Sequence, residues 1–145
     1  WENNKEKKEK KKRNGWFDTI PQSLPALIQA EKIQKKAAQQ GFDWETPQDA
    51  LSKLQEEVQE LQEADRHSDA TAIREELGDV LFSVVNVARK HGIQAEDLLL
   101  DANRKFKERF THATQLASDD SEVFSNLPIH EQESYWQHAK ENSQS

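Results

Sequence analysis

The chain has 145 residues and a net charge of −7, and it contains neither cysteine nor methionine. Leu, Ile, Val and Phe account for only 30 residues, 23 of them between residues 24 and 110, which supports one compact domain and excludes two large ones. Without cysteine there is no disulfide or thiolate metal site, and no apolar run reaches the roughly 18 residues of a membrane span, so we expect a cytoplasmic protein.

Residues 1–20 are expected to form a basic linker with little order. Seven Lys or Arg and three Glu give the first 13 residues a net charge of +4, which leaves −11 for the rest of the chain. This acidic body argues against nucleic-acid binding. Trp1 and Lys5 have the same spacing as Trp136 and Lys140, and the chain does not begin with methionine. Chance would produce this repeat, and so would a tandem protein of which the chain is the second half.

Apolar residues at helical spacing follow, and they predict an all-α fold that resembles a four-helix bundle. Ser23 with Pro25 predicts the start of the first helix and Gly41 its end, while Thr46 before Pro47 predicts the start of the second. We expect main helices at about 25–40, 47–64, 69–90 and 95–115, a loop at 118–125 and a short helix at 128–141. As domains, we expect a helical domain over 21–116 and a C-terminal arm over 117–145.

The third expected helix is unusual because residues 80–88 are apolar nearly all round. A helix without a polar face is buried, either at the centre of a bundle or against another chain. Both locations remain open from the sequence.

Two acidic clusters share one pattern, in which a pair of glutamates is followed three residues later by another acid. Glu57 and Glu60 lie on the expected second helix, and Glu76 and Asp79 lie on the third. Residues three apart lie on one side of a helix. Both pairs flank the apolar stripe of their helix, so antiparallel packing of the two helices would bring four carboxylates together.

Four converging carboxylates repel one another and require a counter-ion. Oxygen ligands favour Mg²⁺ first and Mn²⁺ second, and such a site takes its remaining ligands from water and substrate phosphates, which points to hydrolysis of a phosphoanhydride. A di-iron centre is disfavoured because neither helix has the Glu-x-x-His spacing. The alternative is two solvated acidic helix faces.

Cations and one aromatic residue complete this inventory. Lys53 precedes Glu57 by one turn, and Lys105 and Arg109 are one turn apart. These cations either hold phosphates or balance the charge of acidic helices. Trp136 is a large aromatic residue in a polar tail, where it serves either as a packing anchor or as a platform for a base.

Six stretches of the sequence resemble one known family. They are residues 24–27 (LPAL), 30–34 (AEKIQ), 41–44 (GFDW), 53–60, 75–82 and 102–110. Together with the Trp136 and Lys140 arm, they resemble the C-terminal domain of the MazG nucleoside triphosphate pyrophosphohydrolases.

The resemblance implies an all-α fold whose site is completed in a homodimer. The nearly all-round apolar third helix is the expected interface, and the first helix could equally contribute. It also implies Mg²⁺-dependent hydrolysis of a broad range of (d)NTPs to monophosphate and pyrophosphate. By motif match, the metal ligands are Glu57, Glu60, Glu76 and Asp79, and the residues that support them or orient water are Glu56 and Glu75. The residues that hold phosphates are Lys53, Lys105 and Arg109, and those that close over the nucleotide are Trp136 and Lys140.

Two alternatives stay open at this point. The first is a helical interaction or regulatory module without catalysis. The second keeps the chemistry but changes the substrate, as in related dUTP or dCTP hydrolases or phosphoribosyl-ATP pyrophosphohydrolase. The base preference, the phosphorus attacked and any oligomer beyond a dimer do not follow from the sequence.

Overall fold

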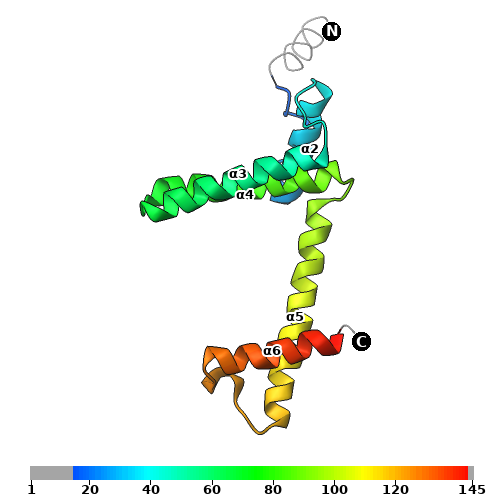
Figure 1. Cartoon of the computed structure of the whole chain (residues 1–145). Helices are drawn as coiled ribbons and strands as arrows, with labels where there is room; N and C mark the ends of the chain where they lie inside the picture. Colours follow the sequence, from blue (N-terminus) through cyan, green and yellow to red (C-terminus); the bar gives the residue numbers. More distant parts are fainter. Residues whose placement is uncertain (1–14, 144–145) are drawn as a thin grey trace, which may run out of the picture. The chain divides into compact units, whose positions relative to one another are not determined.

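The computed structural model describes residues 15–143, and within them the regular structure is entirely helical. The helices are α2 (Ala26–Gln39), α3 (Pro47–Arg66), α4 (Ala70–Lys90), α5 (Ala95–Asp119) and α6 (Ile129–Ser143), with a 3₁₀ turn η1 (Phe124–Asn126) before α6 (Figure 1). The predicted all-α class is confirmed. The repeat formed by Trp1 and Lys5, and most of the expected basic linker, lie outside the described residues. None of the helices described is both long and apolar enough to cross a membrane.

The chain divides between Asp97 and Leu98 into two compact units. The first unit contains α2, α3, α4 and the start of α5, and the second contains the rest of α5, η1 and α6. The domain boundaries expected after residues 20 and 116 stay predictions.

Most helix ends lie where local signals place them. The Thr46 hydroxyl accepts a hydrogen bond from the Asp49 amide at 3.1 Å and caps α3, and the Asp69 carboxylate caps α4 in the same way through the amide of Ala72. Gly41 ends α2 with a φ of 85°, a left-handed conformation that favours glycine.

Two boundaries differ from the prediction. α2 begins at Ala26, one residue after the expected start at about residue 25, and it has no side-chain cap, so Ser23 does not cap it. The fourth main helix continues beyond residue 115 to Asp119. Ala113 and Ala117, one turn apart, are both completely buried, so packing extends the helix past the point where the local apolar pattern fades.

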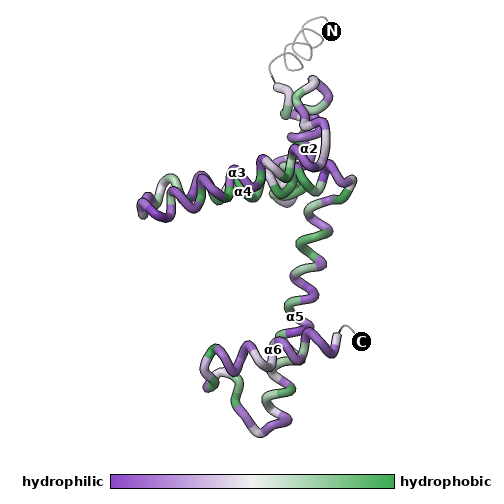
Figure 2. Tube along the Cα trace, in the orientation of Figure 1, coloured by the Kyte–Doolittle hydropathy of each residue, from purple (hydrophilic) through white to green (hydrophobic). Residues whose placement is uncertain are grey.

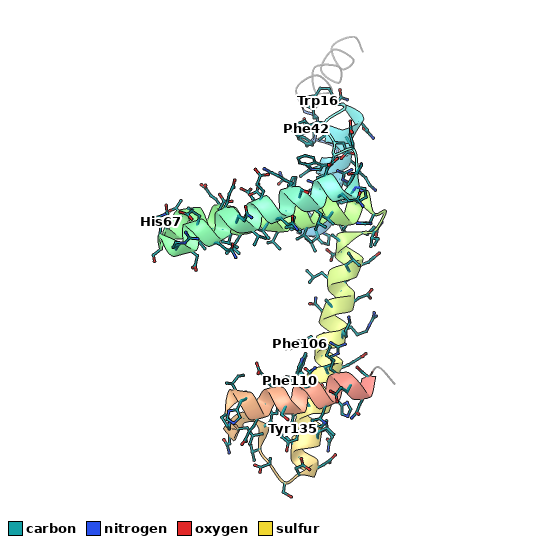
Figure 3. The ribbon with its side chains drawn as sticks, viewed as in Figure 1. Trp16, Phe42, His67, Phe106, Phe110 and Tyr135 are labelled. Carbon is teal, nitrogen blue, oxygen red and sulfur yellow. The ribbon has the colours of Figure 1, made fainter. Side chains whose placement is uncertain are left out.

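In the first unit, α3 and α4 form an antiparallel hairpin, and α2 packs on α4 near the end of the hairpin distant from His67 (Figures 1 and 3). The core here is formed by Val85, Ala88 and Ala95, with Leu27 and Ala30 packed against them. Hydrophobic residues gather around this crossing, whereas the tip of the hairpin is hydrophilic (Figure 2). The apolar packing of α2 on α4 thus holds one end of the α3–α4 hairpin, and the polar residues of the two helices lie beyond it.

One apolar face of α4 is exposed in the part of the chain that the structure describes. Leu77, Leu81 and Val84 are 48%, 60% and 42% exposed. Both locations considered for this helix, the centre of a bundle and an interface with another chain, therefore stay predictions.

In the second unit, α6 packs on α5 through aromatic rings and small residues. The Phe106 and Trp136 ring centroids are 5.1 Å apart, and the Phe110 and Phe124 rings meet edge to face at 5.5 Å. Ala139 is completely buried. Figure 3 shows Phe106, Phe110 and Tyr135 along this part of the molecule.

Candidate metal centre

Three carboxylates converge where α3 and α4 run side by side. Glu57 comes from α3, and Glu76 and Asp79 come from α4; one oxygen of each lies within 4.8 Å of the others. Glu57 is buried, Glu76 is half-buried and Asp79 is exposed. The group is therefore open to solvent on the Asp79 side and closed on the Glu57 side.

The inner oxygens of this group lack partners. Glu57 Oε2 and Glu76 Oε2 are buried and have no hydrogen-bond partner among the described residues, a costly arrangement for carboxylates. Burial, together with the adjacent Glu57 and Glu60 carboxyls, raises the pKa of Glu76 to about 7. A hard divalent cation would satisfy these oxygens and relieve the repulsion, so the residues fit such an ion.

The remaining acidic residues of the pattern lie around this group. Glu60 is exposed and is not one of the three converging ligands, although its charge contributes to the raised pKa of Glu76. Glu56 is exposed and pairs with Lys53 at 3.7 Å. Glu75 is exposed on α4. The structure thus brings together three of the four expected ligands and leaves Glu60 beside them.

Lys53 neutralises part of the cluster. Its ammonium lies 3.2 Å from Glu57 Oε1, and this hydrogen bond, outweighing desolvation, raises the pKa of Lys53. The outer oxygen of Glu57 is therefore paired while the inner one is not. A single lysine leaves the group of carboxylates with excess negative charge.

The other expected substrate residues all belong to the second unit: Lys105, Arg109, Trp136 and Lys140. Trp136 packs on Phe106, and its expected substrate role stays a prediction. Arg109 Nε is buried without a hydrogen-bond partner among the described residues. Lys105 is exposed and Lys140 is half-buried.

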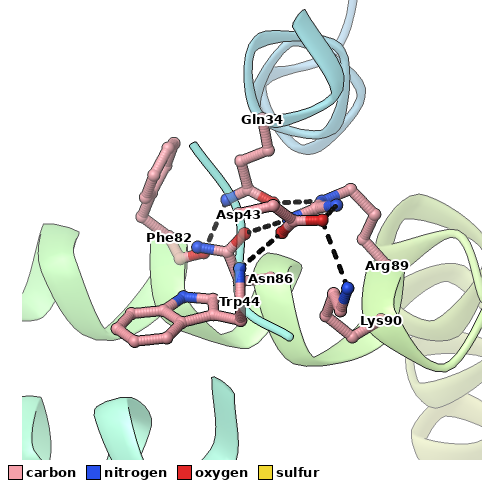
Figure 4. A network of polar contacts seen from close by, with 7 residues as sticks. All are labelled: Gln34, Asp43, Trp44, Phe82, Asn86, Arg89 and Lys90. Atoms are coloured by element: carbon pink, nitrogen blue, oxygen red, sulfur yellow. Dashed lines mark hydrogen bonds and ion pairs between the residues drawn. The ribbon is translucent and has the colours of Figure 1, made fainter. Parts of the chain in front are cut away.

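A second charged group lies on α4, near its C-terminus, and all its charges are paired (Figure 4). Arg89 donates two hydrogen bonds to the Asp43 carboxylate, at 2.7 and 3.3 Å, and Lys90 contacts the same carboxylate at 3.2 Å. The Arg89 hydrogen bond is the main cause that lowers the pKa of Asp43 to about 2. Arg89 also donates to Gln34 at 3.4 Å and to Asn86 at 2.9 Å.

This network holds the loop that follows α2. The Asp43 carboxylate also accepts a hydrogen bond from the Trp44 amide at 2.8 Å, and buried Gln34 donates to the Phe82 carbonyl at 2.9 Å. The loop is thereby joined to both α2 and α4.

A cavity of about 650 Å³ connects the two charged groups. Glu57, Asp79 and Lys53 line one part of it, and Asp43 and Arg89 line another. The rest of the wall is mainly apolar and aromatic: Phe17, Ile33, Ala37, Phe42, Trp44 and Phe82.

Residue spacing does not reveal this paired network or the cavity. Asp43 and Arg89 are 46 residues apart, and Arg89 with Lys90 at the end of a helix reads as an ordinary match to the helix dipole. The one signal in the sequence is the pair of large aromatic residues, Phe42 and Trp44, in a short loop.

The fold and these geometries define a class: an all-helical protein with a carboxylate group suited to a divalent cation beside a large cavity. Residues 45–114 match the model of the MazG nucleotide pyrophosphohydrolase domain. The chain is 40% identical over 140 residues to the nucleoside triphosphate pyrophosphohydrolase/pyrophosphatase MazG of Thermotoga maritima. It is 38% identical over 143 residues to the nucleoside triphosphate pyrophosphohydrolase of Escherichia coli K12. The chain belongs to the MazG family.

These alignments cover 97% of the chain and 54% of each relative, so the chain spans about half the length of the curated relatives it matches. A further relative, the uncharacterized protein YabN of Bacillus subtilis, is 34% identical over 145 residues, which is 97% of this chain and 29% of YabN.

Proposed function

We propose that the chain is a metal-dependent nucleoside triphosphate pyrophosphohydrolase, which converts an NTP or dNTP and water to the monophosphate and pyrophosphate. The observation that carries the proposal is the group formed by Glu57, Glu76 and Asp79, with its unpartnered buried oxygens. The Thermotoga and Escherichia relatives, both named as nucleoside triphosphate pyrophosphohydrolases, support the same activity.

In this proposal Mg²⁺, or Mn²⁺ in its place, is held by Glu57, Glu60, Glu76 and Asp79. The bound cation supplies charge neutralisation of the triphosphate oxygens and acidifies water. Two neighbouring carboxylates, on Glu56 and Glu75, support these ligands and orient the attacking water.

The cations of the chain hold the triphosphate and stabilise the pyrophosphate leaving group. Lys53 is already beside Glu57, and its three donors allow it to contact a phosphate without leaving that carboxylate. By the family resemblance, Lys105 and Arg109 also hold the phosphates, and Trp136 and Lys140 close over the nucleotide.

We further propose that the site is completed in a homodimer. The uncovered α4 face, formed by Leu77, Leu81 and Val84, provides an apolar surface for a second copy. Sedimentation of the purified chain at micromolar concentration should give twice the monomer mass, and Leu81→Glu should give the monomer mass. A wild-type chain that sediments as a monomer would rule out the dimer. Cytoplasmic location stays a prediction from the sequence.

The test of the activity is direct. The purified chain is incubated with Mg²⁺ and a panel of NTPs and dNTPs, and pyrophosphate and monophosphate are quantified. We expect release of both products in equal amounts, and none with EDTA. Release of orthophosphate alone, or no release with any substrate, would contradict the proposal and favour a helical interaction module.

A further inference from the structure

The cavity beside the metal centre extends well beyond what a cation and phosphates occupy. Glu57, Asp79 and Lys53 line only one part of its wall. The volume of about 650 Å³ is that of a typical small-molecule site. The rest of the cavity therefore has room for another part of a ligand.

One face of α4 links the two parts of the cavity. Asp79, Ser83 and Asn86 all line it, and their spacing of four and then three residues places them on one side of the helix. At 1.5 Å per residue, Asp79 and Asn86 are ~10 Å apart along the axis. This length suits a nucleotide whose phosphates lie at the Asp79 end.

The far part of the cavity has flat apolar walls. Phe42 and Trp44 are 83% and 37% exposed, and Phe82 is 41% exposed. The rings of Trp44 and Phe82 lie on the opposite side of the polar network from Arg89 and Lys90 (Figure 4). Exposed rings beside a cavity suit a ligand with a flat π-face.

Polar groups with unused capacity lie between these walls and the carboxylates. The Asn86 side-chain oxygen accepts from Arg89, but no described residue accepts a hydrogen bond from its NH₂ group. The Ser83 hydroxyl likewise has no hydrogen bond within the described part of the chain, although the residue is buried. A ligand in the cavity would meet one fixed amide donor and one hydroxyl.

We propose that this cavity binds the nucleoside part of the substrate, with the base against Trp44, its edge at the Asn86 NH₂ group and the sugar near Ser83. This inference rests on the proposed function and adds the base site to it. The Asp43–Arg89 ion pair holds Trp44 in place, and is a positioning device. The residues that contact the base therefore all belong to the first unit. This contact is additional to the closure of Trp136 over the nucleotide.

The first test fills the cavity. Ala37→Phe places a ring into the cavity from α2, and Gln39→Phe adds the same ring at an exposed position of α2 that does not line it. For pyrophosphate release from NTPs, we expect Ala37→Phe to raise KM at least about tenfold with kcat within about threefold, and Gln39→Phe to match wild type. Circular dichroism checks that both variants fold.

A second pair of variants covers the case in which Ala37→Phe does not fold. Trp44→Ala should raise KM at least about fivefold, while Trp16→Ala, an exposed tryptophan outside the cavity wall, should leave it unchanged. Asn86→Asp keeps the acceptor for Arg89 and removes the donor, so the ratio of kcat/KM for UTP over CTP should change at least about fivefold.

A binding measurement separates this inference from the activity. UMP and CMP are titrated into ¹⁵N-labelled chain with Mg²⁺, and the Trp44 indole signal is assigned through Trp44→Phe. We expect this signal to shift. If wild type hydrolyses NTPs but the Trp44 signal does not move and the cavity variants keep normal KM, the inference is wrong and the proposed function stands. If no pyrophosphate is released, the proposed function fails, and the indole signal alone decides whether the cavity binds nucleosides.

Discussion

Two charged groups, each with members on α4 and about three turns apart along it, differ in whether their charges are paired. At the helix C-terminus, Asp43 accepts from Arg89 and Lys90, and its pKa falls to about 2. Near the middle, Glu57 and Glu76 have buried oxygens without partners, and the pKa of Glu76 rises to about 7. The paired group stabilises the fold by itself, whereas the unpaired group stores repulsion that a bound cation would relieve.

The largest effect should follow from breaking the unpaired group. Asp79→Ala or Glu57→Ala should lower Mg²⁺-dependent pyrophosphate release by about 10³-fold or more, because each removes a ligand of the proposed cation. Asp65→Asn, an exposed acid at the end of α3, is the control and should keep full activity. Helicity by circular dichroism should be unchanged in all three variants. Full activity in Asp79→Ala would contradict the site assignment.

Breaking the paired group should instead act on stability. Arg89→Met leaves the Asp43 carboxylate with Lys90 as its one cationic partner among the described residues, and we expect the free energy of unfolding in urea to fall by about 1–3 kcal/mol. The exposed pair of Arg66 with Glu63, at 3.2 Å, is the matched control. Arg66→Met should change the free energy of unfolding by less than about 0.5 kcal/mol. Equal losses in the two variants would show that the Asp43 network contributes no more than a surface ion pair.

The same network predicts an acid dependence. The pKa of Asp43 is lowered from 3.8 to about 2 in the folded chain, so the unfolded chain takes up the proton first as the pH falls. The stabilisation by Asp43 is complete above about pH 4 and is lost between about pH 4 and pH 2, and it amounts to about 2 kcal/mol. Asp43→Asn should remove this component from unfolding curves measured across that range. An unchanged acid dependence in that variant would assign it to other carboxylates.

The smallest effect should be a gain in stability. Glu76→Gln removes one charge from the repelling group, so in EDTA at pH 8 the thermal midpoint should rise by roughly 2–5 °C. In wild type, added Mg²⁺ should raise the midpoint by mass action, and in Glu76→Gln this response should be reduced or lost. A lower midpoint in EDTA would mean that the Glu76 carboxylate stabilises the metal-free chain.

The helices and the converging carboxylates could be predicted because their signals are local. Thr46 and Asp69 cap through amides three residues ahead, and the spacing of Glu76 and Asp79 fixes their common side of α4. Which carboxylate of α3 meets them is less certain from sequence, because a small rotation of α3 decides between Glu57 and Glu60. In the structure, Glu57 is the α3 carboxylate that converges with Glu76 and Asp79.

The paired network could not be predicted in this way. Asp43 lies in a loop and Arg89 on a helix, and nothing in their local sequences encodes the 2.7 Å contact between them. It depends on how α2 packs on α4, which is decided by side chains such as Leu27 and Val85. Helical periodicity states which face is apolar but not which residues of two helices meet.

The small core has a consequence for how the protein responds to dilution. Among the described residues, Val85 is the largest side chain that is fully buried, and much of the remaining core is alanine. Under the dimer proposal, part of the hydrophobic stabilisation comes from association, so the free energy of unfolding per dimer should fall by about 1.4 kcal/mol for each tenfold dilution. The amount of chain synthesised would then control the fraction that is folded as well as the number of molecules.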